Sequence, residues 1–208
     1  MRSLCLFCSY FTSPKLPHYV RYYLEQLLPH FTDVVFITSN KNMDAESTQW
    51  LADRNIQLMI CENKGWDFGM WHYGLMNSTT DSYERIALVN DSCILFKPLT
   101  DFFKWLNASN LDLAGITDSS QYTYHLQSYF IVMNKRAIAP IVAYFKQHGL
   151  QATREDVILL YELTLAKHLT SHHPQMRAGA MYCWNNFVKE GNPSVYGIDK
   201  LIMAGIQL

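Results

Sequence analysis

The sequence is poor in charge and has no excess of either sign. Of its 208 residues 17% are charged, against about 25% in a typical globular domain, and 17 Lys and Arg are balanced by 18 Asp and Glu. This balance argues against a nucleic-acid-binding protein, which usually has a clear basic excess. Because 49% of the residues are hydrophobic, the composition also excludes a disordered chain. The length is that of one ordinary domain, so we expect residues 1–208 to form a single domain.

The sequence has no hydrophobic run of about 18 residues, so no membrane-spanning helix is expected. The apolar start is short and no small-residue cleavage site follows before Pro14, which favours a first buried strand over a signal peptide. The five cysteines are an odd number, and Cys5-x-x-Cys8 has no second pair to complete a zinc site. Buried free thiols and a cytoplasmic protein are therefore the better interpretation.

Several nucleotide-binding and catalytic motifs are missing. There is no G-x-x-x-x-G-K-[ST] loop, so a P-loop NTPase is excluded. Gly65, Gly69 and Gly74 do not form G-x-G-x-x-G, and neither H-E-x-x-H nor G-x-S-x-G is present. The usual dinucleotide fold, zinc proteases and nucleophile-elbow hydrolases therefore have no support.

Short apolar runs alternate with helical patterns along the whole chain. The patterns predict strands at Leu4–Tyr10, Val34–Thr38, Ile56–Cys61, Ile86–Val89, Leu111–Ile116 and Tyr129–Met133. They predict helices at Leu16–Leu28, Asp44–Asn55, Phe68–Met76 (N-capped by Asp67), Leu99–Leu106, Arg136–Gln147 (kinked or delayed by Pro140) and Glu155–Leu169. This alternation predicts an α/β fold: a Rossmann-like, mostly parallel central sheet with helices on both faces.

Polar residues follow nearly every predicted strand. The polar strand ends are Ser9 and Tyr10, 38–40, 62–67, 90–92, and Thr117 with Asp118. Ligands of open α/β sheets bind at the carboxyl ends of the strands, so we expect a site at this edge. We also expect aromatic rings near it, from Tyr10, Trp66, Trp71, Tyr122 and Tyr124.

The stretch from Asn63 to Gly69 is the first candidate binding motif. Lys64 would approach a phosphate, Trp66 would stack on a base, and Asp67 would bond a sugar hydroxyl. Gly65 allows a tight turn after the strand. The alternative, equally weighted, makes Asp67 a helix cap and Trp66 a core residue.

Asn90-Asp91-Ser92 is the second motif. Asp91 at a strand end is a candidate ligand for Mg²⁺ or Mn²⁺ beside a diphosphate, because hard ions favour oxygen ligands. The neighbours Asn90 and Ser92 weaken that hypothesis, and a plain turn explains the three residues equally well.

Two further segments carry polar groups. His125, Gln127 and Ser128 precede an apolar strand and either line an acceptor pocket or cap the strand. Asp156 lies in an acidic helix start, where the helix dipole alone would explain it.

Four segments together resemble the rhamnan synthesis protein F family. They are 63–69, 89–92, 125–130 and the late Asn192-Pro193-Ser194 with Leu201-Ile202, in the family's order over nearly the whole chain. The resemblance implies a bacterial glycosyltransferase of GT-A-like fold that builds rhamnose-containing cell-wall or lipopolysaccharide glycans. It implies a nucleoside diphosphate sugar donor and a glycan or lipid-linked acceptor at the cytoplasmic face of the membrane, with peripheral membrane association. The family pattern suggests a further short segment after Leu208, so we expect a truncated C-terminus.

Within that interpretation each candidate residue has a role. Donor binding falls to Ser9, Tyr10, Asn63, Lys64, Gly65, Trp66, Asp67, Asn90, Asp91 and Ser92, and acceptor binding to His125, Gln127 and Ser128. An inverting reaction needs a carboxylate to deprotonate the acceptor, for which Asp156 is preferred over Asp118. A divalent cation at Asp91 would stabilise the leaving diphosphate. The alternatives are a catalytically silent sugar- or nucleotide-binding module and, less favoured, a methyltransferase.

Overall fold

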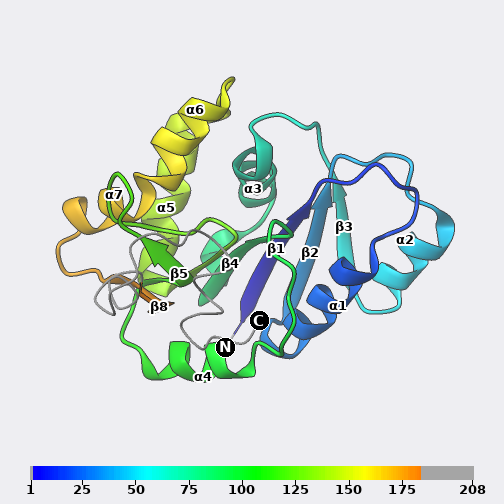
Figure 1. Ribbon diagram of the computed structural model, residues 1–208, viewed down its shortest axis with the longest axis horizontal. Coiled ribbons are helices and arrows are strands. Elements are labelled where there is room, and N and C mark those ends of the chain that lie inside the picture. Colours follow the sequence, from blue (N-terminus) through cyan, green and yellow to red (C-terminus); the bar gives the residue numbers. More distant parts are fainter. Residues whose placement is uncertain (1, 184–208) are drawn as a thin grey trace.

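Eight strands form a central sheet in the computed structural model, which describes residues 2–183 (Figure 1). The strands are β1 (Ser3–Ser9), β2 (Asp33–Thr38), β3 (Ile56–Ile60), β4 (Arg85–Asn90), β5 (Leu113–Ser119), β6 (His125–Leu126), β7 (Phe130–Asn134) and β8 (Ala178–Tyr182). The helices are α1 (His18–Leu27), α2 (Ala45–Ala52), α3 (Trp66–Met76), α4 (Thr100–Ala108), α5 (Lys135–His148), α6 (Arg154–Val157) and α7 (Leu165–His172).

The strand order is β3-β2-β1-β4-β7-β5-β6, and β8 pairs with β5 beside this path. Strands β3, β2, β1 and β4 are parallel neighbours, whereas β7 is antiparallel to both β4 and β5. The expected mostly parallel sheet is therefore confirmed. Because β7 runs in the opposite direction, the segment that precedes it lies at the same edge as the carboxyl ends of β1 and β4.

Helices cover both faces of the sheet, which explains the continuous apolar strands. Leu4 and Leu6 belong to the core on the side of α3, α5 and α7, while Cys5 and Phe7 belong to the core on the side of α1 and α4. Figure 1 shows α3 and α5 above the sheet and α1 and α4 below it. Every residue of β1 is buried, so this strand has no solvent-exposed face.

The helix expected over Glu155–Leu169 is not continuous. α6 ends after one turn, a π-helical turn follows at Ile158–Glu162, and α7 begins at Leu165. Side chains take the carbonyl groups that a regular helix would use: the Tyr144 hydroxyl donates to Leu160 O (2.5 Å) and the Thr164 hydroxyl to Leu159 O (2.5 Å). Hydrophobic periodicity could not show this competition for backbone acceptors.

Other local expectations were also wrong. β6 and β8 were not anticipated, because they are short or have only partly buried patterns. α5 begins at Lys135 and continues past Pro140 to His148, so the proline does not delay its start. Within residues 2–183, no helix combines the length and the apolar character needed to cross a membrane.

Candidate functional site

The carboxylate that follows β4 is held by two hydroxyl groups. Ser9 Oγ donates to Asp91 Oδ2 at 2.7 Å, and the Tyr19 hydroxyl donates to the same oxygen at 3.0 Å. Ser9 ends β1, and because Cys8 pairs with Asn90 in the parallel ladder, the two strand ends lie side by side. Tyr19 comes from the first turn of α1. Two donors on one oxygen fix the rotamer of Asp91.

A second carboxylate is held by an amide. Asn90 Nδ2 donates to Asp67 Oδ2 at 2.6 Å, and Asn90 Oδ1 accepts a hydrogen bond from the Ser92 backbone at 3.0 Å. Asn90 N donates to Tyr129 O, which joins β4 to the segment before β7. The buried Asn90 amide therefore has both ends occupied and positions Asp67, a residue of the first turn of α3.

Burial makes both carboxylates costly to ionise, and the charge of Asp91 adds to that cost at Asp67. Burial raises the pKa of Asp67 to about 6, and the negative charge of Asp91 adds to this rise; the Asn90 hydrogen bond opposes it, and Glu162 contributes a smaller rise. Burial also raises the pKa of Asp91, against the effect of the Ser9 and Tyr19 hydrogen bonds. In the described part of the chain no Lys or Arg forms an ion pair with either group. The site therefore holds negative charge that no Lys or Arg of the described residues balances by an ion pair.

The loop before α3 is unusually tight. Gly65 has a φ of 76°, and a Cβ atom on Gly69 would lie 1.7 Å from Lys64 O. Only glycine fits at these two positions, because one needs a left-handed backbone and the other a close backbone approach. Trp66 also has a positive φ, 53°, and is 44% exposed, so it is not a core residue. Strain at an exposed aromatic is typical of binding sites.

The expected N-cap of α3 was wrong. The helix begins at Trp66 with Gly65 as N-cap, so Asp67 caps nothing and its side chain is available to the site. Lys64 does not reach the buried carboxylates; it forms an ion pair with Glu62 at 2.6 Å, and both side chains are exposed. Asn63 is exposed in the same loop.

The aromatic residues expected near this edge divide into two groups. Tyr10, Trp66, Tyr122 and Tyr124 are exposed. Trp71 is fully buried, and its Nε1 donates to Val89 O at 3.3 Å. Trp71 is therefore a core residue of α3, and its expected place at the edge was wrong.

The predicted acceptor residues lie between β6 and β7. His125 is buried on β6, with Nδ1 2.8 Å from Thr123 O, and its Nε2 lies 3.5 Å from Gln127 Nε2. The Gln127 backbone donates to Thr117 O at 3.0 Å, and Ser128 is half-buried. The His125 ring is thus fixed by its own loop, whereas the Ser128 side chain forms no hydrogen bond with the described residues.

The two candidate bases have different surroundings. Asp118 is buried on β5, and burial together with the Asp118 charge raises the pKa of the adjacent Tyr124. Asp156 is exposed at the start of α6, where its Oδ2 lies 2.7 Å from Thr153 Oγ1 and its backbone N donates to that hydroxyl. Within residues 2–183 the Asp156 side chain has no hydrogen bond with Asp67 or Asp91.

Tyr19 and Glu162 were not anticipated as parts of this site. Tyr19 lies in the first turn of α1, the helix that directly follows β1. In a β–α unit the first turn of the helix lies next to the end of the strand, so the sequence could have predicted that Tyr19 is close to the site. Glu162 approaches Asp67 through the π-helical turn, which hydrophobic periodicity does not predict.

The carboxylates fit a divalent cation only together with a diphosphate. In the part of the chain that is described, no group of three or more His, Cys, Asp or Glu side chains could hold a metal ion. Mg²⁺ is often bound by one or two carboxylates while substrate phosphates and waters complete its shell. Asp91, with Asp67 beside it, could supply the one or two carboxylate ligands of such a coordination shell.

The fold is shared with nucleotidyl- and glycosyltransferases. A 4-diphosphocytidyl-2C-methyl-D-erythritol synthase from Anaerococcus prevotii superposes with a TM-score of 0.56 at 10% identity, over 98% of this chain and 94% of that one. A mannosyltransferase from Pyrobaculum calidifontis, in complex with GDP-Man and Mn²⁺, has a TM-score of 0.53 at 11% identity, over 87% of this chain and 55% of that one. At such identities the likeness concerns the fold alone. No curated protein matches the sequence.

The sequence pattern of one family matches most of the chain. The family described as rhamnan synthesis protein F matches residues 34–175, which include the Asn63–Gly69 loop, Asp91 and the segment before β7. The late segments Asn192–Ser194 and Leu201–Ile202, with the chain end where a truncation was expected, lie outside the described residues. The chain belongs to the rhamnan synthesis protein F family.

Proposed function

We propose that the protein is a glycosyltransferase that moves a sugar, with rhamnose as the first candidate, from a nucleoside diphosphate donor to a growing cell-surface polysaccharide or lipopolysaccharide glycan. One observation carries the proposal: two carboxylates at the carboxyl edge of the sheet are fixed by neutral donors and form no ion pair with a Lys or Arg of residues 2–183. Such an edge is suited to bind hydroxyl groups and a cation–diphosphate unit. Family membership and the shared fold support a transferase.

The donor would lie across the strand ends of β1 and β4. In this arrangement the exposed Trp66 ring stacks on the base, and Asp67 accepts a hydrogen bond from a sugar or ribose hydroxyl. The remaining donor-binding residues would be Ser9, Tyr10, Asn63, Lys64, Gly65, Asn90, Asp91 and Ser92. Lys64 would have to leave Glu62 to reach a phosphate, a change that costs little because both side chains are exposed.

Mg²⁺ or Mn²⁺, if used, would be held by Asp91 together with the diphosphate. A bound cation supplies positive charge to the leaving diphosphate, and the mannosyltransferase of similar fold is described in complex with GDP-Man and Mn²⁺. The chain's own contribution is to keep Asp91 ionised and fixed, through the hydroxyl groups of Ser9 and Tyr19. These hydrogen bonds favour the carboxylate against the effect of burial.

The acceptor would enter beside the segment that precedes β7. Gln127 and Ser128 would bind its hydroxyl groups, while the fixed His125 ring supports this wall. In an inverting transfer a carboxylate removes the proton of the attacking hydroxyl, and Asp156 and Asp118 remain the proposed bases. Asp118 is buried next to Tyr124, whereas Asp156 is exposed at the start of α6.

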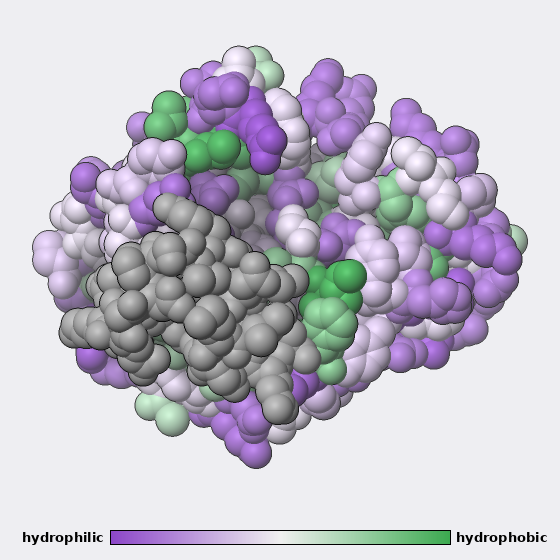
Figure 2. Space-filling view, viewed as in Figure 1, coloured by the Kyte–Doolittle hydropathy of each residue, from purple (hydrophilic) through white to green (hydrophobic). Residues whose placement is uncertain are grey.

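Peripheral membrane contact would use the loop after Asp91. Ile94 and Phe96 in this loop are 53% and 58% exposed, and Lys97 follows them. Figure 2 shows a hydrophobic patch near its centre, over the connection between β4 and α4. Apolar side chains next to a Lys are suited to an anionic membrane surface, which supports a lipid-linked acceptor.

Calorimetric titration with nucleoside diphosphate sugars tests the proposal. We expect binding of a dTDP-, UDP- or GDP-sugar that strengthens with Mg²⁺ or Mn²⁺, is lost in Asp91→Ala, and is retained in Asp101→Ala, an exposed aspartate of α4. Slow donor hydrolysis should accompany binding. Absence of binding for every donor, with and without cation, would contradict the proposal.

A second candidate is a catalytically silent module that binds the same ligands. The observation in its favour is that Asp91 is flanked by Asn90 and Ser92, so the segment departs from the Asp-x-Asp pattern that holds a metal ion in many sugar transferases. It predicts donor binding with neither hydrolysis nor transfer to any acceptor, even with added cation.

A further inference from the structure

A cavity lies at the edge of the sheet where the strands begin, opposite the edge that carries Asp67 and Asp91. Its volume is about 340 Å³, at the lower end of the range of about 300 to 1,000 Å³ for small-ligand sites. It lies on the α3 side of β1, β2 and β3, beyond the point where α3 ends and the chain turns away through residues 77–79. The seven residues of β1 separate it from Ser9 by about 20 Å. This cavity is therefore not part of the site around Asp91.

The cavity has an apolar floor and an amide-rich rim. Leu4 and Val35 are buried and line its floor. The rim carries the exposed polar side chains of Asn55, Gln57, Asn77 and Thr79 and the half-buried Ser78. Of these, the Asn55 and Gln57 amides form no hydrogen bond with any described residue. Two amides with both donors and acceptors unused thus border one concave surface.

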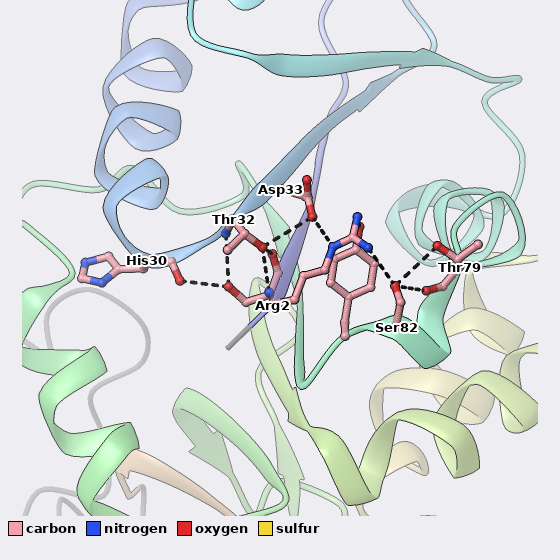
Figure 3. A network of polar contacts seen from close by, with 8 residues as sticks. Arg2, His30, Thr32, Asp33, Thr79 and Ser82 are labelled. Carbon is pink, nitrogen blue, oxygen red and sulfur yellow. Dashed lines mark hydrogen bonds and ion pairs between the residues drawn. The ribbon is translucent and has the colours of Figure 1, made fainter.

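The one cation and the one anion of this cavity neutralise each other. Arg2 Nε lies 3.1 Å from Asp33 Oδ2, and the guanidinium group lies over the Tyr83 ring at 4.7 Å. Arg2 Nη1 also approaches Ser82 Oγ at 3.4 Å. Figure 3 shows Arg2 between Asp33 on one side and Ser82 with Thr79 on the other. Arg2 is therefore paired with Asp33 and packed on Tyr83, so the two charged residues that line the cavity leave it with no net charge.

The end of α3 disfavours anions further. The carboxyl end of a helix carries a partial negative charge, and α3 ends next to the cavity. Its last carbonyl groups are already occupied, because Asn77 Nδ2 donates to Tyr73 O and Ser78 Oγ to Gly74 O. A phosphate or nucleotide is thus a poor ligand here. An electrically neutral molecule with many hydroxyl groups and an apolar face fits all these features.

We propose that this cavity is a binding site for a neutral saccharide. The amide groups of Gln57 and Asn55 would each exchange hydrogen bonds with adjacent hydroxyl groups, while the C–H face of a sugar ring packs on Leu4 and Val35. The identity of the natural ligand rests on the proposed function: it would be a part of the acceptor glycan that lies far from the point of transfer. The site would then retain a growing chain about 20 Å from the point of transfer.

The test is an NMR titration of the ¹⁵N-labelled protein with neutral oligosaccharides: a rhamnose disaccharide, maltotriose and cellotriose. We expect at least one of them, at up to about 20 mM, to shift the backbone amide signals of Asn55, Gln57 and Ser78. Gln57→Leu should weaken this binding about three- to tenfold, because two hydrogen bonds are lost. Gln57→Glu, which keeps the shape but removes the amide donors, should also weaken it.

Gln147→Leu is the matched control, since Gln147 is an exposed glutamine of α5 outside the cavity. The proposal is wrong if no oligosaccharide shifts the three signals, if Gln57→Leu and Gln147→Leu bind alike, or if inorganic phosphate shifts the same signals as strongly. A nucleoside diphosphate sugar should shift signals around Asp91 and be unaffected by Gln57→Leu. If the protein bound an oligosaccharide at this cavity but bound no nucleoside diphosphate sugar, the proposed function would be refuted and the saccharide site would be supported.

Discussion

The two edges of the sheet hold their carboxylates in opposite ways. At the carboxyl edge, Asp67 and Asp91 are bound by an amide and two hydroxyl groups, all neutral. At the amino edge, Asp33 is paired with Arg2, and the pair is partly exposed. At both edges the carboxylates have hydrogen-bond partners, but among residues 2–183 only the carboxylate of the amino edge is paired with a cation.

The carboxylates of the carboxyl edge are positioned by their partners, whereas the ion pair of the amino edge balances charge. Neutral donors fix a carboxylate without cancelling its charge, so burial still raises the pKa values of Asp67 and Asp91, and the charge of Asp91 raises the pKa of Asp67 further. An ion pair at the surface cancels charge but contributes little energy. The carboxyl edge thus costs folding free energy that a bound ligand can return, as functional sites commonly do.

The largest expected effect is on transfer by Asp91→Ala. Removing the fixed carboxylate should lower the transfer rate by about a hundredfold or more, as for other groups that stabilise developing charge. The free energy of unfolding should stay the same or rise at pH 7, because the variant no longer buries that charge. Transfer assays and urea denaturation measure the two quantities.

Asp101→Ala is the control for this variant, since Asp101 is exposed in the first turn of α4. If Asp91→Ala left the transfer rate unchanged, the carboxyl edge would have no role in catalysis. If Asp91→Ala unfolded the protein, the buried charge of Asp91 would not cost folding free energy.

The sequence was sufficient to predict which strand ends meet at the carboxyl edge, but not how the side chains there are paired. Apolar strands that end in Ser9, Asn90 and Asp91 place these residues on one edge, since parallel strands end together. The pairing of Asn90 with Asp67 could not be predicted, because it depends on α3 beginning at Trp66 after a left-handed Gly65. A shift of two residues in the start of the helix, from Phe68 to Trp66, turns Asp67 from a cap into a site residue.

The rest of the site depended on tertiary contacts. Tyr19 bonds Asp91 across 72 positions, and Glu162 reaches Asp67 through an irregular turn that side-chain hydrogen bonds create. Trp71 was misplaced because its helix is apolar on all sides, so spacing could not show which face is buried.

The next effect in size is a pH dependence of stability at Asp67. Its pKa in the folded protein is about 6 against an ordinary 3.8, so the folded state holds this proton more tightly. Stability from this group is therefore present below pH 3.8 and is lost as the pH rises through 6. Allowing for its partial exposure, the loss is about 2 kcal/mol.

Asp67→Asn should remove this loss. The variant should exceed the parent in free energy of unfolding at pH 7.5 by more than it does at pH 4, in urea denaturation across that range. A difference between the two proteins that is constant with pH would show that Asp67 titrates normally, and the contrast between the edges would then depend on Asp91 alone.

The smallest effect is expected at the amino edge and has the opposite sign. Asp33→Asn removes the partner of Arg2, a pair whose side chains are 40% and 54% exposed, and should lower the free energy of unfolding at pH 7 by at most about 1 kcal/mol. Because salt screens exposed charges, the difference should shrink toward zero in 1 M NaCl, where the Debye length is about 3 Å. Asp67→Asn, whose charge is buried, should keep its effect in the same salt. If both variants responded to salt alike, the two edges would differ in hydrogen-bond partners but not in the energy that their charges cost.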